Sequence, residues 1–397
     1  MLLPILLSFL ISEAPAETAP PVKLVISADA VYSADGNLLE GGTVAIAGGK
    51  IAAVVPGGDG GEGALHVAAI TPGLIDLSPR IHTGDYSVEE ASEVRPGDLA
   101  AGSLDLFDKR WERLLESGVT TVMVGPAYEN VIGGLSSVIK TGGKKRIEAR
   151  TIAEGNALIG AFGGQAARGN SPVFGRPTTF FARRPTTRMG TEWAHRKAFY
   201  DTLAAMRDEE RQFEGWEAMA SVIEGERPFF VQAGATQDIR TACYLKEEFG
   251  LPSMVLDGAA EATREPEILK RAGAAVVLPP HAAQGRTAVD NAFMPWNTAD
   301  ELLELGVPVA LSAHGSASAN ANLGMQAGYA MRGGLELDEA LRAVTLTPAE
   351  LAGVADRVGT IEVGKDADLV LWSGTPFAAT SRVIGVVLDG EVVFSAK

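Results

Sequence analysis

The two ends of the chain share one pattern of hydrophobic and polar positions, which differs from that of the middle. Between residues 23 and 55, short alternating apolar runs are separated by Asp-Gly and Gly-Gly dipeptides, which are typical of hairpin turns. The same pattern returns in residues 359–372 and 383–394. Strand edges left unpaired are prone to aggregate. We therefore expect strands from both termini to pair in one small β-sandwich.

In the middle of the chain, apolar strand-like runs alternate with segments of helical period. This alternation indicates repeated βα units around a parallel sheet. The expected strands are 68–77, 119–124, 137–141, 228–233, 253–257, 274–278 and 307–311. The expected helices are 99–117, 216–224, 236–250, 261–272, 298–305 and 337–343. If one poorly marked strand is added, the number of expected barrel strands approaches eight. We therefore predict an α/β fold of the (β/α)8 TIM-barrel type. In such barrels the functional residues lie at the C-terminal ends of the strands.

These patterns divide the chain into a leader (1–16), a first sandwich part (17–70), the barrel (71–355) and a second sandwich part (356–397). Residues 1–11 form an apolar run too short to span a bilayer, and the small residues Ala14-Pro15-Ala16 follow. We interpret the run as a signal peptide cleaved after Ala16, which predicts a periplasmic or secreted protein. No Lys or Arg precedes the run, so a buried apolar strand is the alternative.

Composition narrows the choice of partners. The 34 basic and 50 acidic residues give a net charge of -16, and the basic residues form no long cluster. Nucleic acid and anionic membrane surfaces are therefore poor partners, and no integral membrane segment is expected. The single cysteine, Cys243, lies in an amphipathic helical stretch, where we expect a core residue and not a nucleophile.

One long segment, residues 163–189, is rich in Gly, Arg, Pro and Thr and has weak periodicity. A loop of this length in a compact domain often acts as a lid or a contact surface. A tolerated insertion is the alternative. Its place between barrel units predicts that it crosses the mouth of the barrel.

Residues 71–76, Thr-Pro-Gly-Leu-Ile-Asp, end the first barrel strand and resemble a motif of the amidohydrolase superfamily, in particular its imidazolonepropionase-like branch. Further matching segments are 118–122, 130–134 with 138–140, 187–190 and 364–369. The resemblance covers nearly the whole chain. It implies a metal-dependent hydrolase of non-peptide C–N bonds, in amides or cyclic amides, with zinc held in a barrel and a composite domain from both termini.

The positions that match the family's metal ligands hold other residues here. In the family a His-x-His pair follows the Asp of the motif, because two imidazoles two residues apart on a strand point the same way. Ser78 and Arg80 occupy these places, Gln232 and Gly258 replace two later histidines, and His314 stands near the expected aspartate. A catalytic zinc ion needs about three N, S or carboxylate ligands from the protein. We therefore predict no bound metal.

The remaining cations and histidines offer weaker candidates. Some relatives carboxylate a strand-end lysine to bridge two metals; without histidines, Lys140 is expected to be a cation at the barrel mouth or part of a structural ion pair. Arg80 is expected either to enter the vacated metal position and pair with Asp76 or Asp257, or to reach solvent. His66, His82, His195 and His281 are expected to be surface or hydrogen-bonded residues, with His82 and His281 as weak alternative ligands near the mouth.

Three functions remain open at this stage. The first is a metal-free pseudoenzyme, a scaffold or partner that associates with itself or with an active relative. The second is a C–N hydrolase with a relocated site, although Ser78 has no visible His–acid partner that would make it a nucleophile. The third is a small-molecule-binding protein that uses the barrel mouth.

Overall fold

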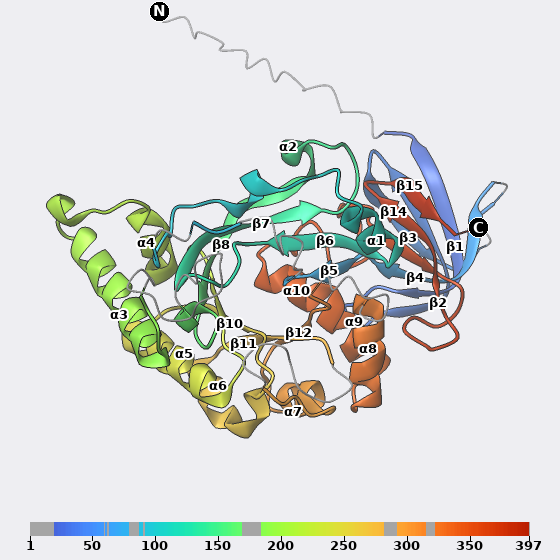
Figure 1. Cartoon of the computed structure of the whole chain (residues 1–397). Coiled ribbons are helices and arrows are strands. Elements are labelled where there is room, and N and C mark those ends of the chain that lie inside the picture. Colours follow the sequence, from blue (N-terminus) through green and yellow to red (C-terminus); the bar gives the residue numbers. More distant parts are fainter. Residues whose placement is uncertain are drawn as a thin grey trace, which may run out of the picture.

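The computed structural model describes residues 20–58, 60–61, 63–78, 87–89, 92–168, 184–281, 292–314 and 322–396. Within them the chain forms two β-sheets, with helices packed mainly around the second (Figure 1). The predicted signal peptide, residues 1–16, lies outside the described residues and stays a prediction. The segment boundaries predicted from the sequence stay predictions as well.

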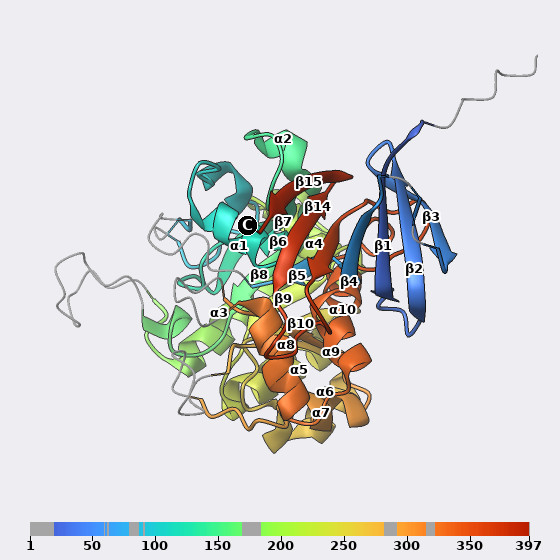
Figure 2. The ribbon, with the colours of Figure 1, turned by 90° about the vertical axis from the view of Figure 1, so that its right-hand side faces the viewer.

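The first sheet, here called the terminal sheet, combines strands from both ends of the chain (Figure 2). Its order is β15-β14-β13-β4-β1-β2-β3. The expectation that residues 23–55 and 359–394 share one sheet is confirmed, whereas a two-layer sandwich stays a prediction. The strands are β1 (Val22–Tyr32), β2 (Leu38–Ala47), β3 (Lys50–Pro56), β4 (Leu65–Pro72), β13 (Leu369–Trp372), β14 (Val383–Leu388) and β15 (Glu391–Ser395).

The second sheet, here called the barrel sheet, has eight strands in the order β12-β11-β10-β9-β8-β7-β6-β5 and is nearly closed. They are β5 (Leu74–Asp76), β6 (Val119–Val124), β7 (Ile132–Lys140), β8 (Thr151–Ala161), β9 (Phe229–Gln232), β10 (Met254–Asp257), β11 (Ala275–Leu278) and β12 (Val309–Leu311). The poorly marked eighth strand is β8.

One strand departs from the predicted (β/α)8 pattern. β7 runs antiparallel to both β6 and β8, whereas the other neighbouring pairs are parallel. The expectation of an all-parallel barrel is therefore wrong at this position. Only residues 125–131 and 141–150 connect β7 to its neighbours, and a parallel crossover needs a dozen or more residues.

Helices α3 to α9 lie along the outside of β8 to β12 (Figure 1). The α-helices are α1 (Arg110–Glu116), α2 (Ile147–Arg150), α3 (Arg188–Ala205), α4 (Trp216–Glu224), α5 (Thr236–Phe249), α6 (Pro266–Ala272), α7 (Thr298–Glu304), α8 (Leu323–Arg332), α9 (Leu337–Val344) and α10 (Leu346–Leu351). Short 3-10 turns cover Ala100–Ser103, Ala166–Arg168, Glu209–Arg211 and Ala262–Arg264. The predicted helix 99–117 is thus two shorter elements.

The chain passes from the terminal sheet into the barrel sheet at Gly73, between β4 and β5. A Cβ atom at this position would lie 1.9 Å from Oγ1 of Thr120, at the start of β6. Only glycine permits this approach, because any larger side chain would push β5 away from its partner. The glycine of the Thr-Pro-Gly-Leu-Ile-Asp motif thus sets the junction between the two sheets.

The two faces of the barrel sheet bury different clusters. Phe229, Val231 and Leu256 pack with helix residues such as Phe199 and Leu245 on the outer face. The alternate residues of the same strands form a separate inner cluster that includes Ile75, Met123, Phe230, Val255, Val277 and Ala310. Successive side chains of a strand point to opposite faces. The next residues of the inner set, Gln232, Asp257 and Ser312, therefore lie at the C-terminal ends of their strands on the inner face.

Candidate functional site at the barrel mouth

The polar layer above the inner cluster contains Asp257, at the end of β10. Its side chain is buried, and its Oδ2 accepts a hydrogen bond of 2.7 Å from Oγ of Ser78, which follows β5. The hydroxyl of Tyr128, in the connection between β6 and β7, donates to the same oxygen. Three distant parts of the chain thus meet at one carboxyl group. Ser78 does lie at the mouth, but its hydroxyl donates its hydrogen bond to Asp257.

Gln232, at the end of β9, is the neighbour of Asp257 in the parallel register of β9 and β10. It is only 2% exposed, and its Oε1 is buried without a hydrogen-bond partner. The Oε1 atom of Gln232 is therefore a buried acceptor at the mouth that is unused within the described part of the chain.

Gly258 follows Asp257 with a φ of +71°. A Cβ atom there would meet no atom within 4 Å, so the space beside Gly258 is open. A left-handed φ favours glycine over residues with a side chain. The position that matches a family histidine thus has room for a side chain but an unfavourable backbone for one.

Asp76, at the end of β5, forms a second group of polar contacts at the mouth, which shares Ser78 with the first. Its carboxylate accepts hydrogen bonds from the backbone N of Ser78 at 3.0 Å, from Oγ of Ser312 at 2.6 Å and from the backbone N of Ala313 at 3.1 Å. Burial raises the pKa of Asp76 to about 6, against the lowering effect of these hydrogen bonds. Its hydrogen-bond donors in the described chain are all neutral groups.

Two of the histidines behave as structural residues. His195, in α3, is fully buried, stacks on Phe162 and shares a 3.0 Å hydrogen bond through Nδ1 with the backbone O of Thr191. Burial lowers its pKa to about 4. His66, in β4, is hydrogen-bonded to Ser27 at 3.0 Å. The expectation of hydrogen-bonded histidines is confirmed for both residues.

His281 and His314 lie close to the mouth. The ring of His281 stacks on Trp296 with centroids 4.7 Å apart, and burial lowers its pKa to about 4. His314 follows β12 with a φ of +51°, and its backbone N donates to Oγ of Ser312 at 3.0 Å. A positive φ is uncommon for a residue other than glycine.

The described residues at the family's ligand positions do not fit a zinc site. The hydroxyl of Ser78 is committed to Asp257, Gly258 has no side chain, and the carboxamide of Gln232 is a weak ligand beside the N, S and carboxylate groups that zinc takes. His314 alone of this set carries a strong ligand atom. Within the described ranges, no three His, Cys, Asp or Glu side chains converge as a metal-binding group.

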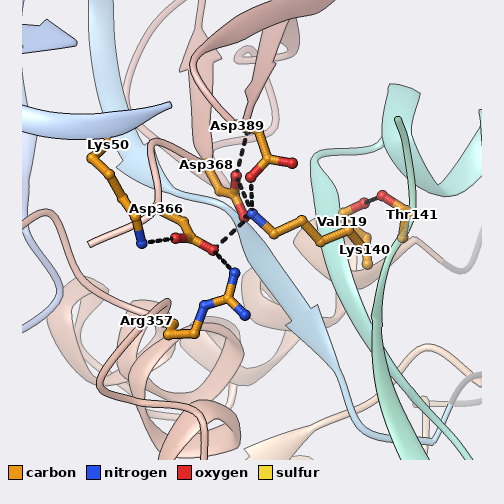
Figure 3. A network of polar contacts seen from close by, with 8 residues as sticks. All are labelled: Lys50, Val119, Lys140, Thr141, Arg357, Asp366, Asp368 and Asp389. Atoms are coloured by element: carbon orange, nitrogen blue, oxygen red, sulfur yellow. Dashed lines mark hydrogen bonds and ion pairs between the residues drawn. The ribbon is translucent and has the colours of Figure 1, made fainter. Parts of the chain in front are cut away.

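Lys140 lies at the opposite end of the barrel from the mouth, so its expected place there is wrong. Because β7 is reversed, its last residue pairs with Thr121 near the start of β6. Nζ of Lys140 contacts Asp366 at 2.8 Å and Asp368 at 3.1 Å and also pairs with Asp389 (Figure 3). The alternative of a structural ion pair is confirmed.

This ion-pair network ties the barrel sheet to the terminal sheet. Lys50 and Arg357 also contact Asp366, the latter at 2.8 Å (Figure 3). Burial by itself would raise the pKa of Asp366, but the hydrogen bonds from Lys140 and Lys50 outweigh it and lower the pKa. Burial raises the pKa of Asp368 to about 6 despite the charge of Lys140.

Several expectations fall on residues outside the described ranges. Arg80, His82 and residues 169–183 of the predicted loop 163–189 are among them, so their places at the mouth stay predictions.

Cys243 is described and buried, and burial raises the pKa of its thiol to about 12. That environment disfavours the thiolate and agrees with a core residue.

Two residues of the mouth were missed in the sequence. Tyr128 stands in a connection without periodicity, and Ser312 follows a short apolar strand as one of many serines. Only the positions of strand ends could have indicated them, because side chains at the C-terminal ends of barrel strands converge.

Comparison with known proteins agrees with this architecture. Residues 233–393 match the model of the amidohydrolase family. The chain is 24% identical over 365 residues to amidohydrolase tasK of Hapsidospora irregularis, covering 82% of this chain and 36% of the relative. It is 30% identical over 169 residues to the imidazolonepropionase of Thermoplasma acidophilum, covering 40% of each. The chain thus spans about a third of the length of the curated relatives it matches.

Among solved structures, an amidohydrolase from Thermotoga maritima is similar with a TM-score of 0.82 and 29% identity, covering 94% of this chain and 100% of the other. A Xaa-Pro dipeptidase is similar with a TM-score of 0.59 and 16% identity, covering 94% and 100%, which shows the fold alone. The chain therefore belongs to the amidohydrolase superfamily. No helix in the described ranges is long and apolar enough to cross a membrane.

Proposed function

We propose that this amidohydrolase-family protein is a metal-free pseudoenzyme, secreted or periplasmic, that serves as a scaffold or partner for another copy of itself or for an active relative. The observation that carries the proposal is the 2.7 Å hydrogen bond between Ser78 and Asp257. In the family the position of Ser78 holds a ligand, whereas here its side chain is used to stabilise a buried carboxyl group. The side chain at this ligand position thus forms a hydrogen bond within the fold.

The partner role has separate support. The matched segment makes up only 36% of amidohydrolase tasK, so in that relative a chain of this type continues into a much longer polypeptide. A domain that is joined to further protein in a relative supports a role beside other protein here.

The test measures hydrolysis with substrates of the relatives. Purified protein supplied with zinc is assayed on imidazolone propionate and on a Xaa-Pro dipeptide, with an imidazolonepropionase and a Xaa-Pro dipeptidase as positive controls. We expect rates at the buffer background for the wild type and for Asp257→Asn. Turnover that the wild type shows and Asp257→Asn loses would support instead the second hypothesis, a hydrolase with a relocated site.

The partner role needs a different measurement. The chain is isolated from its own host under native conditions and its mass is compared with the 41.4 kDa of a monomer. We expect a heavier assembly that contains either further copies or another amidohydrolase chain. A monomer that also fails to hydrolyse either substrate would contradict the scaffold proposal and leave small-molecule binding as the function.

A further inference from the structure

We propose that two copies of this chain associate through the outward side of helix α3, with the two helices crossing antiparallel about a twofold axis between residues 194 and 195. The inference deepens the proposed function and rests on its scaffold part, because it names the partner as a second copy and locates the surface. The outward side, here called the α3 face, consists of six residues at helical spacing. They are Met189, Glu192, Trp193, Arg196, Lys197 and Tyr200.

The α3 face carries large apolar side chains where a surface helix is usually polar. Met189, Trp193 and Tyr200 are 77%, 63% and 55% exposed, whereas His195 and two threonines are on the buried side of the helix. The three exposed side chains are four and seven residues apart, so they lie along one side of α3. The helix itself lies on the side of the molecule opposite the terminal sheet (Figure 1). A surface on which large apolar side chains gather marks an interaction site.

Two members of the α3 face are held in place by residues of α5. The hydroxyl of Tyr200 donates to Oε1 of Glu248 at 3.0 Å, and Nε of Arg196 donates to Oε2 of the same carboxylate at 2.6 Å. The Tyr200 ring also packs edge-on against Phe249. Side chains that are already ordered lose less conformational entropy on binding. Arginine, tyrosine and tryptophan are also the residue types that contribute most to binding energy at interfaces.

The order of the residues along α3 makes the face complementary to itself. In an antiparallel pair of helices about a twofold axis, positions at equal distances from the axis come opposite each other. Met189 then faces Tyr200 of the second copy, and Trp193 faces Arg196 of the second copy. A thioether beside an aromatic ring and a guanidinium over an indole are both favourable contacts. Each contact forms twice, because the axis repeats it.

The charges of α3 favour this arrangement over a parallel one. Glu192 comes opposite Lys197 of the second copy, and Arg188 comes opposite Asp201 of the second copy. A parallel pair would instead bring each charged residue toward its own counterpart, and like charges at an interface are destabilising. On the surface of one chain Lys197 contacts Asp201. Such an exposed pair contributes little to stability, so it leaves Lys197 able to reach a partner.

The exposed apolar area is large enough for a dimer of modest affinity. An aromatic side chain buries about 150 to 250 Å² when it is fully covered, so at the exposed fractions given above the four rings of two copies contribute on the order of 500 Å². The two methionines and the polar residues of the face extend this area toward the roughly 1,000 Å² of a specific interface. We therefore expect a dissociation constant in the micromolar range.

The first experiment measures the mass of the purified full chain by sedimentation velocity over a range of concentrations. We expect the mass to rise from the 41.4 kDa of a monomer toward twice that value. Trp193→Ala should raise the dissociation constant at least about tenfold, because it removes a ring on both sides of the axis. The matched control is Phe107→Ala, which removes a ring that is 70% exposed outside α3 and should leave the dissociation constant unchanged.

The second experiment tests the twofold arrangement by exchanging charges. Glu192→Lys brings two lysines together on each side of the axis, and Lys197→Glu brings two glutamates together in the same way. We expect each variant alone to dimerise at least about tenfold more weakly than the wild type. An equimolar mixture of the two variants brings a lysine opposite a glutamate on both sides, so the mixed dimer should regain an affinity close to that of the wild type. Melting temperatures check that both variants are folded.

Three results would overturn the proposal. The first is a wild type that stays monomeric well above micromolar concentrations. The second is a dimer of folded Trp193→Ala that is as tight as that of the wild type. The third is a mixture of the two charge variants that dimerises no better than either variant alone, and this result is decisive even if Trp193→Ala fails to fold.

These experiments separate the inference from the proposed function. If the dimer forms through α3 but hydrolyses a substrate with zinc, the inference stands and the pseudoenzyme proposal fails. If the purified chain stays monomeric but is recovered from its host together with another amidohydrolase chain, the scaffold proposal stands and the inference fails.

Discussion

The hydroxyl of Ser312 donates a 2.6 Å hydrogen bond to the carboxylate of Asp76, although 236 residues separate them. Asp76 ends β5 and Ser312 follows β12, the two outermost strands in the order of the barrel sheet. No register between β5 and β12 is found within the described ranges. A side-chain contact therefore joins the two edges of the sheet at the mouth. The carboxylate that forms this contact, that of Asp76, is buried.

Asp76 makes the stability of the protein depend on pH. Its folded-state pKa is about 6, above the usual value of 3.8, mainly because it is buried. Between these two pH values the folded state holds a proton that the unfolded state releases. The contribution of protonated Asp76 to the free energy of unfolding is therefore fully present below about pH 3.8 and is lost as pH rises through 6. The difference of about 2 in pKa corresponds to on the order of 3 kcal/mol.

The measurement is urea unfolding at pH 4.5, 5.5 and 7 for the wild type and Asp76→Asn. We expect the free energy of unfolding of the wild type, relative to the variant, to fall across this range. An equal pH dependence in both proteins would show that Asp76 titrates normally, and the account of its burial would be wrong.

His195 acts in the opposite direction over a similar range. Burial lowers its pKa to about 4, so between these pH values the unfolded state binds a proton that the folded state does not. The contribution of neutral His195 to the free energy of unfolding is fully present above about pH 6.5, and roughly 3 kcal/mol of it is lost as pH falls through 4. We expect His195→Leu to reduce this loss of stability at acid pH in the same unfolding series. His66→Leu, at an exposed ring on the terminal sheet, is the control and should leave this loss of stability unchanged.

Removal of Lys140 should strongly destabilise the protein. Its Nζ neutralises Asp366 and Asp368, whose side chains are 2% and 3% exposed. Lys140→Met leaves both carboxylates buried beside Asp389 without this cation, and breaking a buried pair from one side typically costs about 3 to 5 kcal/mol. Lys23→Met removes an exposed pair with Glu391 and should cost less than about 1 kcal/mol. Equal losses in the two variants would mean that the network is not a stabilising junction.

Much of the fold was predictable because strands of a barrel are short, apolar and separated by helical periods. β6 and α4 were predicted to the residue. β8 was missed because Glu154, Gly155 and Asn156 interrupt its apolar pattern. α3 was missed because the usual burial is inverted: Trp193 and Tyr200 are 63% and 55% exposed whereas His195 is buried, so no amphipathic period stands out.

The site was predictable by position but not in its contacts. Strand ends located Ser78, Gln232 and Gly258 at the mouth. Periodicity carries no information on strand direction, and so Lys140, at the end of the one reversed strand, was placed at the wrong end of the barrel. The hydrogen bond between Ser78 and Asp257 could not be predicted, because it depends on how two strands 179 residues apart face each other.

Restoring the family's ligands should restore a metal site if their loss is what removed it. The variant combines Ser78→His, Arg80→His, Gln232→His, Gly258→His and His314→Asp. The open space beside Gly258 accepts a side chain, although the φ of +71° makes this substitution cost about 1 to 2 kcal/mol. We expect zinc to raise the melting temperature of this variant and not that of the wild type. A version that keeps Gly258 tests whether the backbone at this position limits the gain.

The most direct test of the central claim is elemental analysis of the wild-type protein after expression and dialysis with added zinc, manganese and iron. The account predicts far less than one metal ion per chain, because Ser78, Arg80, Gln232 and Gly258 stand where ligands are needed. About one tightly held metal ion per chain would contradict it and identify the protein as a metalloenzyme whose ligands lie elsewhere.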